Sequence, residues 1–275
     1  GRGWETRPTL IKSFLEGSGS KIEIYQPEKA SDDSFIEKIN KLSADVFVVV
    51  DYGQILSKQV LDIPKKYAIN LHPSLLPKYR GATPINQTIL NGDNVAGVTV
   101  INMTERMDAG EIILQDRVDI DEEMDAVKLS SELSVKGAGI ILKVLDLIAA
   151  GNEVLTEQNE EEALYAKRLN KDYGEINWRE SSYDICRKIK GLKPWPGTYT
   201  HIDGKRLKII DAVISDFVPD KSVPGLLFFG EDLLICTGDG AISIKEVQLE
   251  GKKVVSQGEF VRGYSIKKGT VLGKK

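Results

Sequence analysis

Three side chains in the first half of the sequence could stabilise charge at a carbonyl centre. Asn70 and His72 end the run YAINLH (67–72), and their spacing puts both on the same side of a β-strand. Asp108 follows later in MDAG (107–110), where Gly110 gives backbone freedom. An amide donor and an imidazole suit an oxygen that gains negative charge, and a nearby carboxylate fixes the imidazole tautomer and favours the imidazolium. Each residue alone is more often structural, as a strand-end cap or a turn former.

Alternating strand and helix patterns supply the scaffold for these residues. The expected strands are 21–26, 45–51, 67–72, 96–103 and 111–120, and the expected helices are 32–44, 57–63, 84–92 and 124–151. Gly151 is expected to end the last helix. This order predicts an α/β fold, a doubly wound domain with a mostly parallel sheet, in which ligands bind at the carboxyl ends of the strands.

The pattern changes after residue 151. Residues 152–172 are highly charged and are expected to link residues 1–151 to a second domain at 173–275. That domain begins with a helix at 181–192, opened by a capping box of Ser181 and Asp184. Short strands then follow at 197–202, 205–214, 225–230, 232–238 and 241–250. They predict a small closed or nearly closed β-barrel.

Composition indicates an ordinary cytoplasmic globular protein of 275 residues, with 41% apolar and 28% charged residues and no apolar run long enough to cross a bilayer. Two cysteines without a metal-type spacing and two histidines give no zinc ligand set, so no metal is expected. From residue 173 onward, 17 Lys and Arg stand against 13 Asp and Glu, an excess of four positive charges on a chain whose net charge is −4. The basic second domain fits either a polyanion-binding surface or ordinary surface scatter.

Longer motifs carry a family resemblance. NLHPSLLPKYRGATPI (70–85), followed by AGVTVINMTERMDAGEIILQ (96–115), resembles the folate-dependent formyltransferases, whose signature is Asn-x-His, a Ser-Leu-Leu-Pro loop, Arg-Gly and a later Asp-x-Gly. The likeness continues in YGQIL (52–56), YAKRLNKDYGEINW (165–178) and PWPGTYT (194–200), and so covers nearly the whole chain. It implies a Rossmann-like core followed by an OB-like barrel.

The resemblance implies an activity and a catalytic trio. Asn70, His72 and Asp108 would catalyse transfer of the formyl group of 10-formyltetrahydrofolate to the amine of methionyl initiator tRNA, for translation initiation. Asn70 and a protonated His72 would stabilise the oxyanion while Asp108 holds the imidazole.

The resemblance also implies binding residues. Ser74, Leu75, Leu76 and Pro77 would form part of the folate site, although the two leucines fit a core equally well, and Tyr52 and Ile55 would wall the pterin pocket. The candidate tRNA contacts are Arg2, Arg7, Arg80, Lys188, Lys190, Arg206, Lys208, Lys252, Lys253, Lys267 and Lys268.

Several alternatives remain at this level. A formyltransferase acting on a nucleotide-linked amino sugar shares the trio and the folate loop, a formyltetrahydrofolate hydrolase shares the signature, and a glycinamide ribonucleotide formyltransferase would lack the second domain. An RNA-binding protein with an inactive site belongs to another class. Relatives open with a strand, a helix and a second strand that precede Gly1, so we expect the sequence to be a fragment. A monomer is the default expectation.

Overall fold

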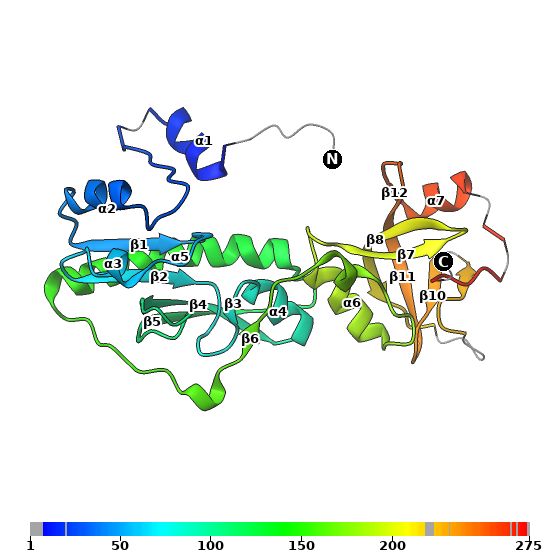
Figure 1. Cartoon of the computed structure of the whole chain (residues 1–275). Coiled ribbons are helices and arrows are strands. Elements are labelled where there is room, and N and C mark those ends of the chain that lie inside the picture. The colour runs from blue at the N-terminus through cyan, green and yellow to red at the C-terminus, as the bar shows by residue number, and fades with distance from the viewer. Residues whose placement is uncertain are drawn as a thin grey trace.

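The computed structural model describes residues 8–19, 21–217, 223–230, 232–264, 266–267 and 269–273. The first part of the chain contains a four-stranded sheet with helices on both faces (Figure 1). In spatial order its strands are β1 (Val46–Val50), β2 (Tyr67–His72), β4 (Val95–Asn102) and β5 (Ile112–Asp119). The helices in this part of the chain are α1 (Leu10–Gly17), α2 (Asp33–Asn40), α3 (Lys58–Leu61), α4 (Pro84–Asn91) and α5 (Ala126–Ala150).

The pairing confirms the α/β class and refines the expected sheet. β1 and β2 are parallel, as expected, whereas β2 with β4 and β4 with β5 are antiparallel. The described sheet is therefore mixed, with parallel pairing at β1 and β2 only. The reason is partly length, because residues 103–111 between β4 and β5 are too few for the crossover of about a dozen residues that parallel neighbours need.

Apolar side chains divide between two cores. On one face of the sheet, α5 buries a stripe that includes Leu129, Leu133 and Val144 against β4 and β5. On the other face, α2 and α3 form a second cluster in which Phe47 and Val49 of β1 take part. Because apolar clusters cover both faces of the sheet, β2 and its polar end lie in the middle of the domain.

Helix ends largely follow the local sequence signals. The Asp125 side chain accepts hydrogen bonds from the first turn of α5, and Gly151 ends that helix with a left-handed φ of 68°, as expected. The expected strand at 21–26 is wrong, because that segment has no regular secondary structure. An alternating apolar pattern indicates only on which face of a strand each side chain would lie. A strand also needs backbone hydrogen bonds to a neighbouring strand.

The charged segment after α5 lies along the first domain. Thr156 bridges to Ile112, and the short strand β6 (Tyr165–Ala166) pairs in parallel with β3 (Arg80–Gly81). Two 3₁₀ turns, η1 (Glu160–Glu162) and η2 (Lys171–Gly174), complete the segment. Figure 1 shows it passing beneath the sheet before it enters the second domain.

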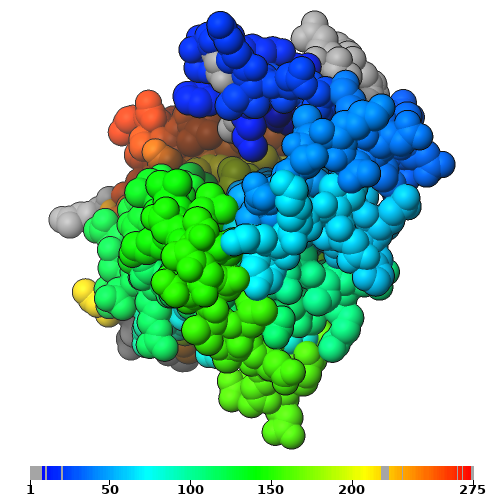
Figure 2. Space-filling model, turned by 90° about the vertical axis from the view of Figure 1, so that its left-hand side faces the viewer, coloured from blue at the N-terminus to red at the C-terminus, as the bar shows by residue number. Residues whose placement is uncertain are grey.

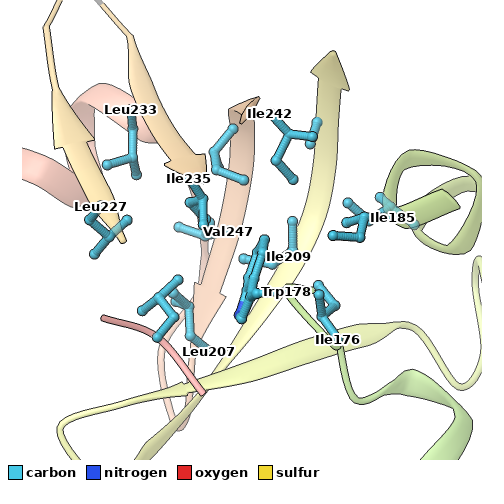
Figure 3. Packing of buried hydrophobic residues seen from close by; sticks show 14 of the residues in the cluster. Ile176, Trp178, Ile185, Leu207, Ile209, Leu227, Leu233, Ile235, Ile242 and Val247 are labelled. Atoms are coloured by element: carbon cyan, nitrogen blue, oxygen red, sulfur yellow. The ribbon is translucent and has the colours of Figure 1, made fainter. Parts of the chain in front are cut away.

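The second domain consists of α6 (Ser182–Gly191) and an antiparallel sheet. In spatial order the sheet contains β7 (Thr198–Ile202), β8 (Lys205–Ile214), β11 (Ala241–Leu249), β10 (Leu233–Cys236) and β9 (Leu227–Phe229), with β12 (Val254–Ser256) paired to β11 and followed by α7 (Gln257–Gly263). Within the described residues the pairing path has two ends, so the barrel is not closed. Trp178 lies at the centre of the core, among Ile176, Leu207 and Ile209 (Figure 3).

The two domains meet where α4 packs against α6. Nδ2 of Asn86 donates to the Gly191 carbonyl at 2.7 Å, and Nζ of Lys193 lies 3.2 Å from Asp125 and 3.3 Å from Asp211, one carboxylate in each domain. Helix α1 lies along one edge of the molecule, above α2, in both Figure 1 and Figure 2. No helix in the described part of the chain is long and apolar enough to span a membrane.

Candidate active site

The chain brings Asn70, His72 and Asp108 together at the end of β2. β2 lies between β1 and β4, and the loop after β4 carries Asp108 back to it. Oδ1 of Asp108 lies 3.5 Å from Nδ2 of Asn70 and 3.6 Å from Nδ1 of His72. One carboxylate oxygen thus faces both an amide donor and a ring nitrogen, which is the arrangement that the sequence predicts.

Burial sets the protonation of His72. The residue is 4% exposed, and its Nε2 lies 2.9 Å from the carbonyl oxygen of Tyr79. Burial lowers the pKa of His72 below 6.5, and the opposing attractions of Asp108 and of the Tyr79 carbonyl are smaller. Asp108 therefore acts in the expected direction, but the ring is neutral near pH 7, not protonated. Because a carbonyl can only accept, Nε2 carries the proton, and Nδ1, which faces Oδ1 of Asp108, carries the lone pair.

The backbone around Asp108 explains the nearby glycines. The Gly81 N–H donates to Oδ2 of Asp108 at 2.8 Å, so both carboxylate oxygens have partners. Gly81 has a φ of 109°, and a Cβ there would lie 2.8 Å from the Ala166 carbonyl oxygen. A Cβ on Gly110 would lie 1.7 Å from the Asn102 carbonyl oxygen, so close approach between the ends of the loop, and not a left-handed turn, requires that glycine.

The side chain of Thr99 holds the backbone of the Ser-Leu-Leu-Pro loop. Its hydroxyl donates to the Ser74 carbonyl at 2.6 Å and accepts from the Leu76 N–H at 3.1 Å and from Gln115 at 2.9 Å. The side chains of Ser74 and Leu76 are buried, whereas Leu75 and Pro77 are half-buried. The loop thus presents its backbone and two partly accessible side chains. Tyr52 is 43% exposed and Ile55 is 85% exposed, so both are free to contact a ligand.

The structure changes the set of candidate tRNA contacts. Arg80 is fully buried, so the predicted contact of its guanidinium with tRNA has no support in the structure. Lys188 and Lys190 are partly exposed and each donates to a carbonyl, Nζ of Lys188 to that of Glu175 at 2.8 Å and Nζ of Lys190 to that of Glu122. An ammonium group has further donors, so these two residues stay predictions. The remaining candidates Arg206, Lys208, Lys252, Lys253 and Lys267 are exposed. Arg2, Arg7 and Lys268 lie outside the described residues.

Arg80 instead belongs to a network that the sequence did not reveal. Its Nε and Nη2 donate to Oε1 of Gln158 at 3.1 and 2.8 Å, and its Nη1 donates to Glu160 at 3.1 Å. Gln158 lies in the charged segment after α5, where no periodicity or motif marks it. Only the docking of that segment places it beside Asp108.

Other chemistry has little support in the described residues. No group of three His, Cys, Asp or Glu side chains in the described ranges could hold a metal ion. Cys186 and Cys236 are free and buried, and burial raises the pKa of the Cys186 thiol to about 11 and also raises that of Cys236. Both thiols therefore stay protonated near pH 7 and are poor nucleophiles.

Family comparisons first define the class. Residues 6–145 match the formyl transferase family, and residues 168–265 match the formyl transferase C-terminal domain. Among solved structures, a sugar 3N-formyl transferase, WlaRD, crystallised with dTDP and 5-N-formyl-THF, has a TM-score of 0.65 at 22% identity over 89% of this chain and 82% of its own. HypX from Aquifex aeolicus in complex with tetrahydrofolic acid has a TM-score of 0.64 at 18% identity over 86% of this chain and 44% of its own. At these identities the likeness shows the fold.

Curated relatives then define the particular family within this class. The methionyl-tRNA formyltransferase of Clostridium acetobutylicum is 43% identical over 99% of this chain and 88% of its own length. That of Agathobacter rectalis is 39% identical over 98% of this chain and 87% of its own. The chain belongs to the methionyl-tRNA formyltransferase family.

Proposed function

We propose that this chain transfers the formyl group of 10-formyltetrahydrofolate to the α-amine of methionyl initiator tRNA, in the cytoplasm, for translation initiation. The observation that carries the proposal is the assembled trio of Asn70, His72 and Asp108 in a chain similar to methionyl-tRNA formyltransferases over almost its whole length. A degenerate RNA-binding relative would have no reason to keep these three side chains in contact.

The protonation of His72 suggests how the trio works. The neutral amine attacks the formyl carbon, and the Asn70 amide donates to the oxygen that gains negative charge. Nδ1 of His72 accepts the proton that the amine loses, and Asp108 stabilises the imidazolium that forms. His72 then returns the proton to the folate nitrogen as the bond between that nitrogen and the formyl carbon breaks. The nucleophile comes from the substrate, so the protein needs no serine or cysteine for attack.

The fixed loop suits a donor site. Thr99 and Gln115 hold the backbone of Ser74 and Leu76, so the loop that begins two residues after His72 is rigid before any ligand arrives. We place the folate beside Ser74, Leu75, Leu76 and Pro77. Half-exposed Tyr52 and exposed Ile55 offer an apolar wall for the pterin ring.

The second domain supplies the proposed tRNA surface. Lys208 of β8 pairs with Gln248 of β11, so the β7–β8 turn and the β11–β12 turn lie at the same end of the sheet. Arg206, Lys208, Lys252 and Lys253 are therefore neighbours, and we call them the basic cluster. Such exposed charges favour phosphate contacts that carry no sequence information. On this proposal residues 173–275 bind tRNA and residues 1–151 carry out the chemistry.

The test is formyl transfer from 10-formyltetrahydrofolate to methionyl initiator tRNA, with a nucleotide-linked amino sugar as competing acceptor. We expect transfer to tRNA, and Asn70→Ala should lower kcat about 10²- to 10³-fold because it removes an oxyanion donor. Asn40→Ala, at the exposed end of α2, is the matched control and should act as the wild type does.

Two results would contradict the proposal. Transfer to the amino sugar and not to tRNA would show that the acceptor substrate is a nucleotide-linked amino sugar. An absence of transfer together with no thermal stabilisation by a formylfolate analogue would indicate an RNA-binding protein without folate chemistry.

A further inference from the structure

Asp108 is held in an unusual backbone conformation. Its φ is 51°, in the left-handed region that residues with a Cβ seldom adopt. Its loop is otherwise open to solvent, since Arg106 and Met107 have large exposed fractions. Something outside the loop must therefore stabilise this conformation if the carboxylate is to stay beside Asn70 and His72.

A single side-chain amide makes that contact. Nε2 of Gln158 donates to the main-chain carbonyl of Asp108 at 2.8 Å and to that of Gly110 at 2.7 Å. The two bonds span Ala109, so they hold the loop on both sides of the turn. Gln158 reaches the loop from the segment after α5, well away from Asp108 in the sequence.

Arg80 determines which way the Gln158 amide faces. Two guanidinium nitrogens of Arg80 donate to Oε1 of Gln158, so the amide oxygen points toward Arg80 and the NH₂ group points toward the two carbonyls. The opposite orientation would place donor against donor and acceptor against acceptor. The guanidinium itself is fully buried and is held by Glu160, which also binds Arg106 at 3.0 Å.

We infer that Gln158, oriented by the buried Arg80, is a positioning residue that fixes the carboxylate of Asp108 for catalysis. The inference rests on the proposed function, since it takes Asp108 as a member of the catalytic trio. A carboxylate displaced by about 1 Å can lower the turnover by a factor of about 10². The charged connecting segment would thus complete the active site in addition to joining the domains.

Gly81 provides a readout that does not depend on activity. Its N–H donates to Oδ2 of Asp108, so its amide chemical shift and hydrogen exchange report where the carboxylate lies. The variants are Gln158→Met, which removes both donors, and Gln158→Glu, which keeps an acceptor for Arg80 but removes both donors. Asp108→Asn defines the Gly81 signal without the charged acceptor. Gln26→Met is the matched control, because exposed Gln26 contacts only Lys12 among the described interactions.

In the ¹⁵N-labelled chain of 275 residues, Gln158→Met should move the Gly81 signal toward its position in Asp108→Asn and speed its exchange about 10-fold, with other core amides unchanged. The kcat should fall about 10- to 100-fold, and KM for both substrates should change less than 2-fold. If Gln158→Met fails to fold, Gln158→Glu carries the same test. A Gly81 signal at the wild-type position in a folded Gln158 variant would overturn the inference. If the wild type transfers no formyl group to tRNA, the proposed function fails while the Gly81 result still tests the positioning.

Discussion

Oδ1 of Asp108 lies 3.6 Å from Nδ1 of His72, inside a site where the histidine is almost completely buried. The carboxylate is the charged group that can stabilise the ring once it takes up a proton. Catalysis by this pair therefore depends on a proton that arrives during the reaction, because burial keeps the resting ring neutral.

Replacing that carboxylate tests its role. Asp108→Asn keeps the shape of the side chain but removes the charge that stabilises an imidazolium at His72. We expect kcat for formyl transfer to fall about 10²-fold or more, with KM for tRNA nearly unchanged. Asp62→Asn is the control, because Asp62 is exposed just after α3 and its side chain bonds only to Lys58 among the described interactions. A wild-type kcat in Asp108→Asn would remove Asp108 from the mechanism.

Stability should depend on pH through His72. Its pKa is lowered in the folded chain, so the unfolded chain binds more protons between the folded pKa and about 6.5. Stability is therefore full above about pH 6.5 and declines as the pH falls below it, by at most about 1.4 kcal/mol per pH unit for this one group. Urea unfolding at pH 7.5 and pH 5.5 measures the loss. The loss should be smaller in His72→Gln and should persist in His201→Gln, and equal losses in both variants would contradict this assignment.

Thr99 should couple stability to folate affinity. Thr99→Val keeps the side-chain shape but removes a buried hydroxyl that contacts Ser74, Leu76 and Gln115. We expect a loss of about 1–3 kcal/mol in the free energy of unfolding and a higher KM for 10-formyltetrahydrofolate, because the loop loses its support.

The same exchange in the second domain is the control. Thr198→Val removes a buried hydroxyl that donates to the Ile209 carbonyl at 2.8 Å. It should lower stability without changing the KM for folate. An unchanged KM in Thr99→Val as well would separate this loop from the donor site.

The basic cluster should set the salt dependence of tRNA binding. Changing Arg206, Lys208, Lys252 and Lys253 to Gln should reduce the slope of log Kd against log salt by about 0.9 for each phosphate that is no longer neutralised, and so by about 3 to 4 if all four bind. The measurement is a titration of tRNA binding at several salt concentrations. Four exposed lysines of the first domain, Lys29, Lys41, Lys128 and Lys143, changed to Gln form the control. Equal slopes for the two variants would rule out the cluster.

Much of the architecture could be predicted from local patterns. β2 and β8 occupy the expected residues, and α5 ends at Gly151, because strand alternation, helical periodicity and a left-handed glycine are properties of short segments. The pairing directions were harder to predict, since β2 with β4 and β4 with β5 are antiparallel where a mostly parallel sheet was expected. Pairing depends on which strands meet in space, and a local pattern does not contain that information.

The sequence by itself determined the family, the α/β class and the identity of Asn70, His72 and Asp108, because residue types and their spacing are enough to carry a motif. Only the tertiary structure decided that His72 is neutral, that Arg80 is buried, and that Gln158 holds the loop of Asp108. These properties depend on desolvation and on contacts between segments that are distant along the chain. The contacts of Arg80 and of the Asp108 loop form when the connecting segment packs against the first domain, and no local stretch of the sequence contains that information.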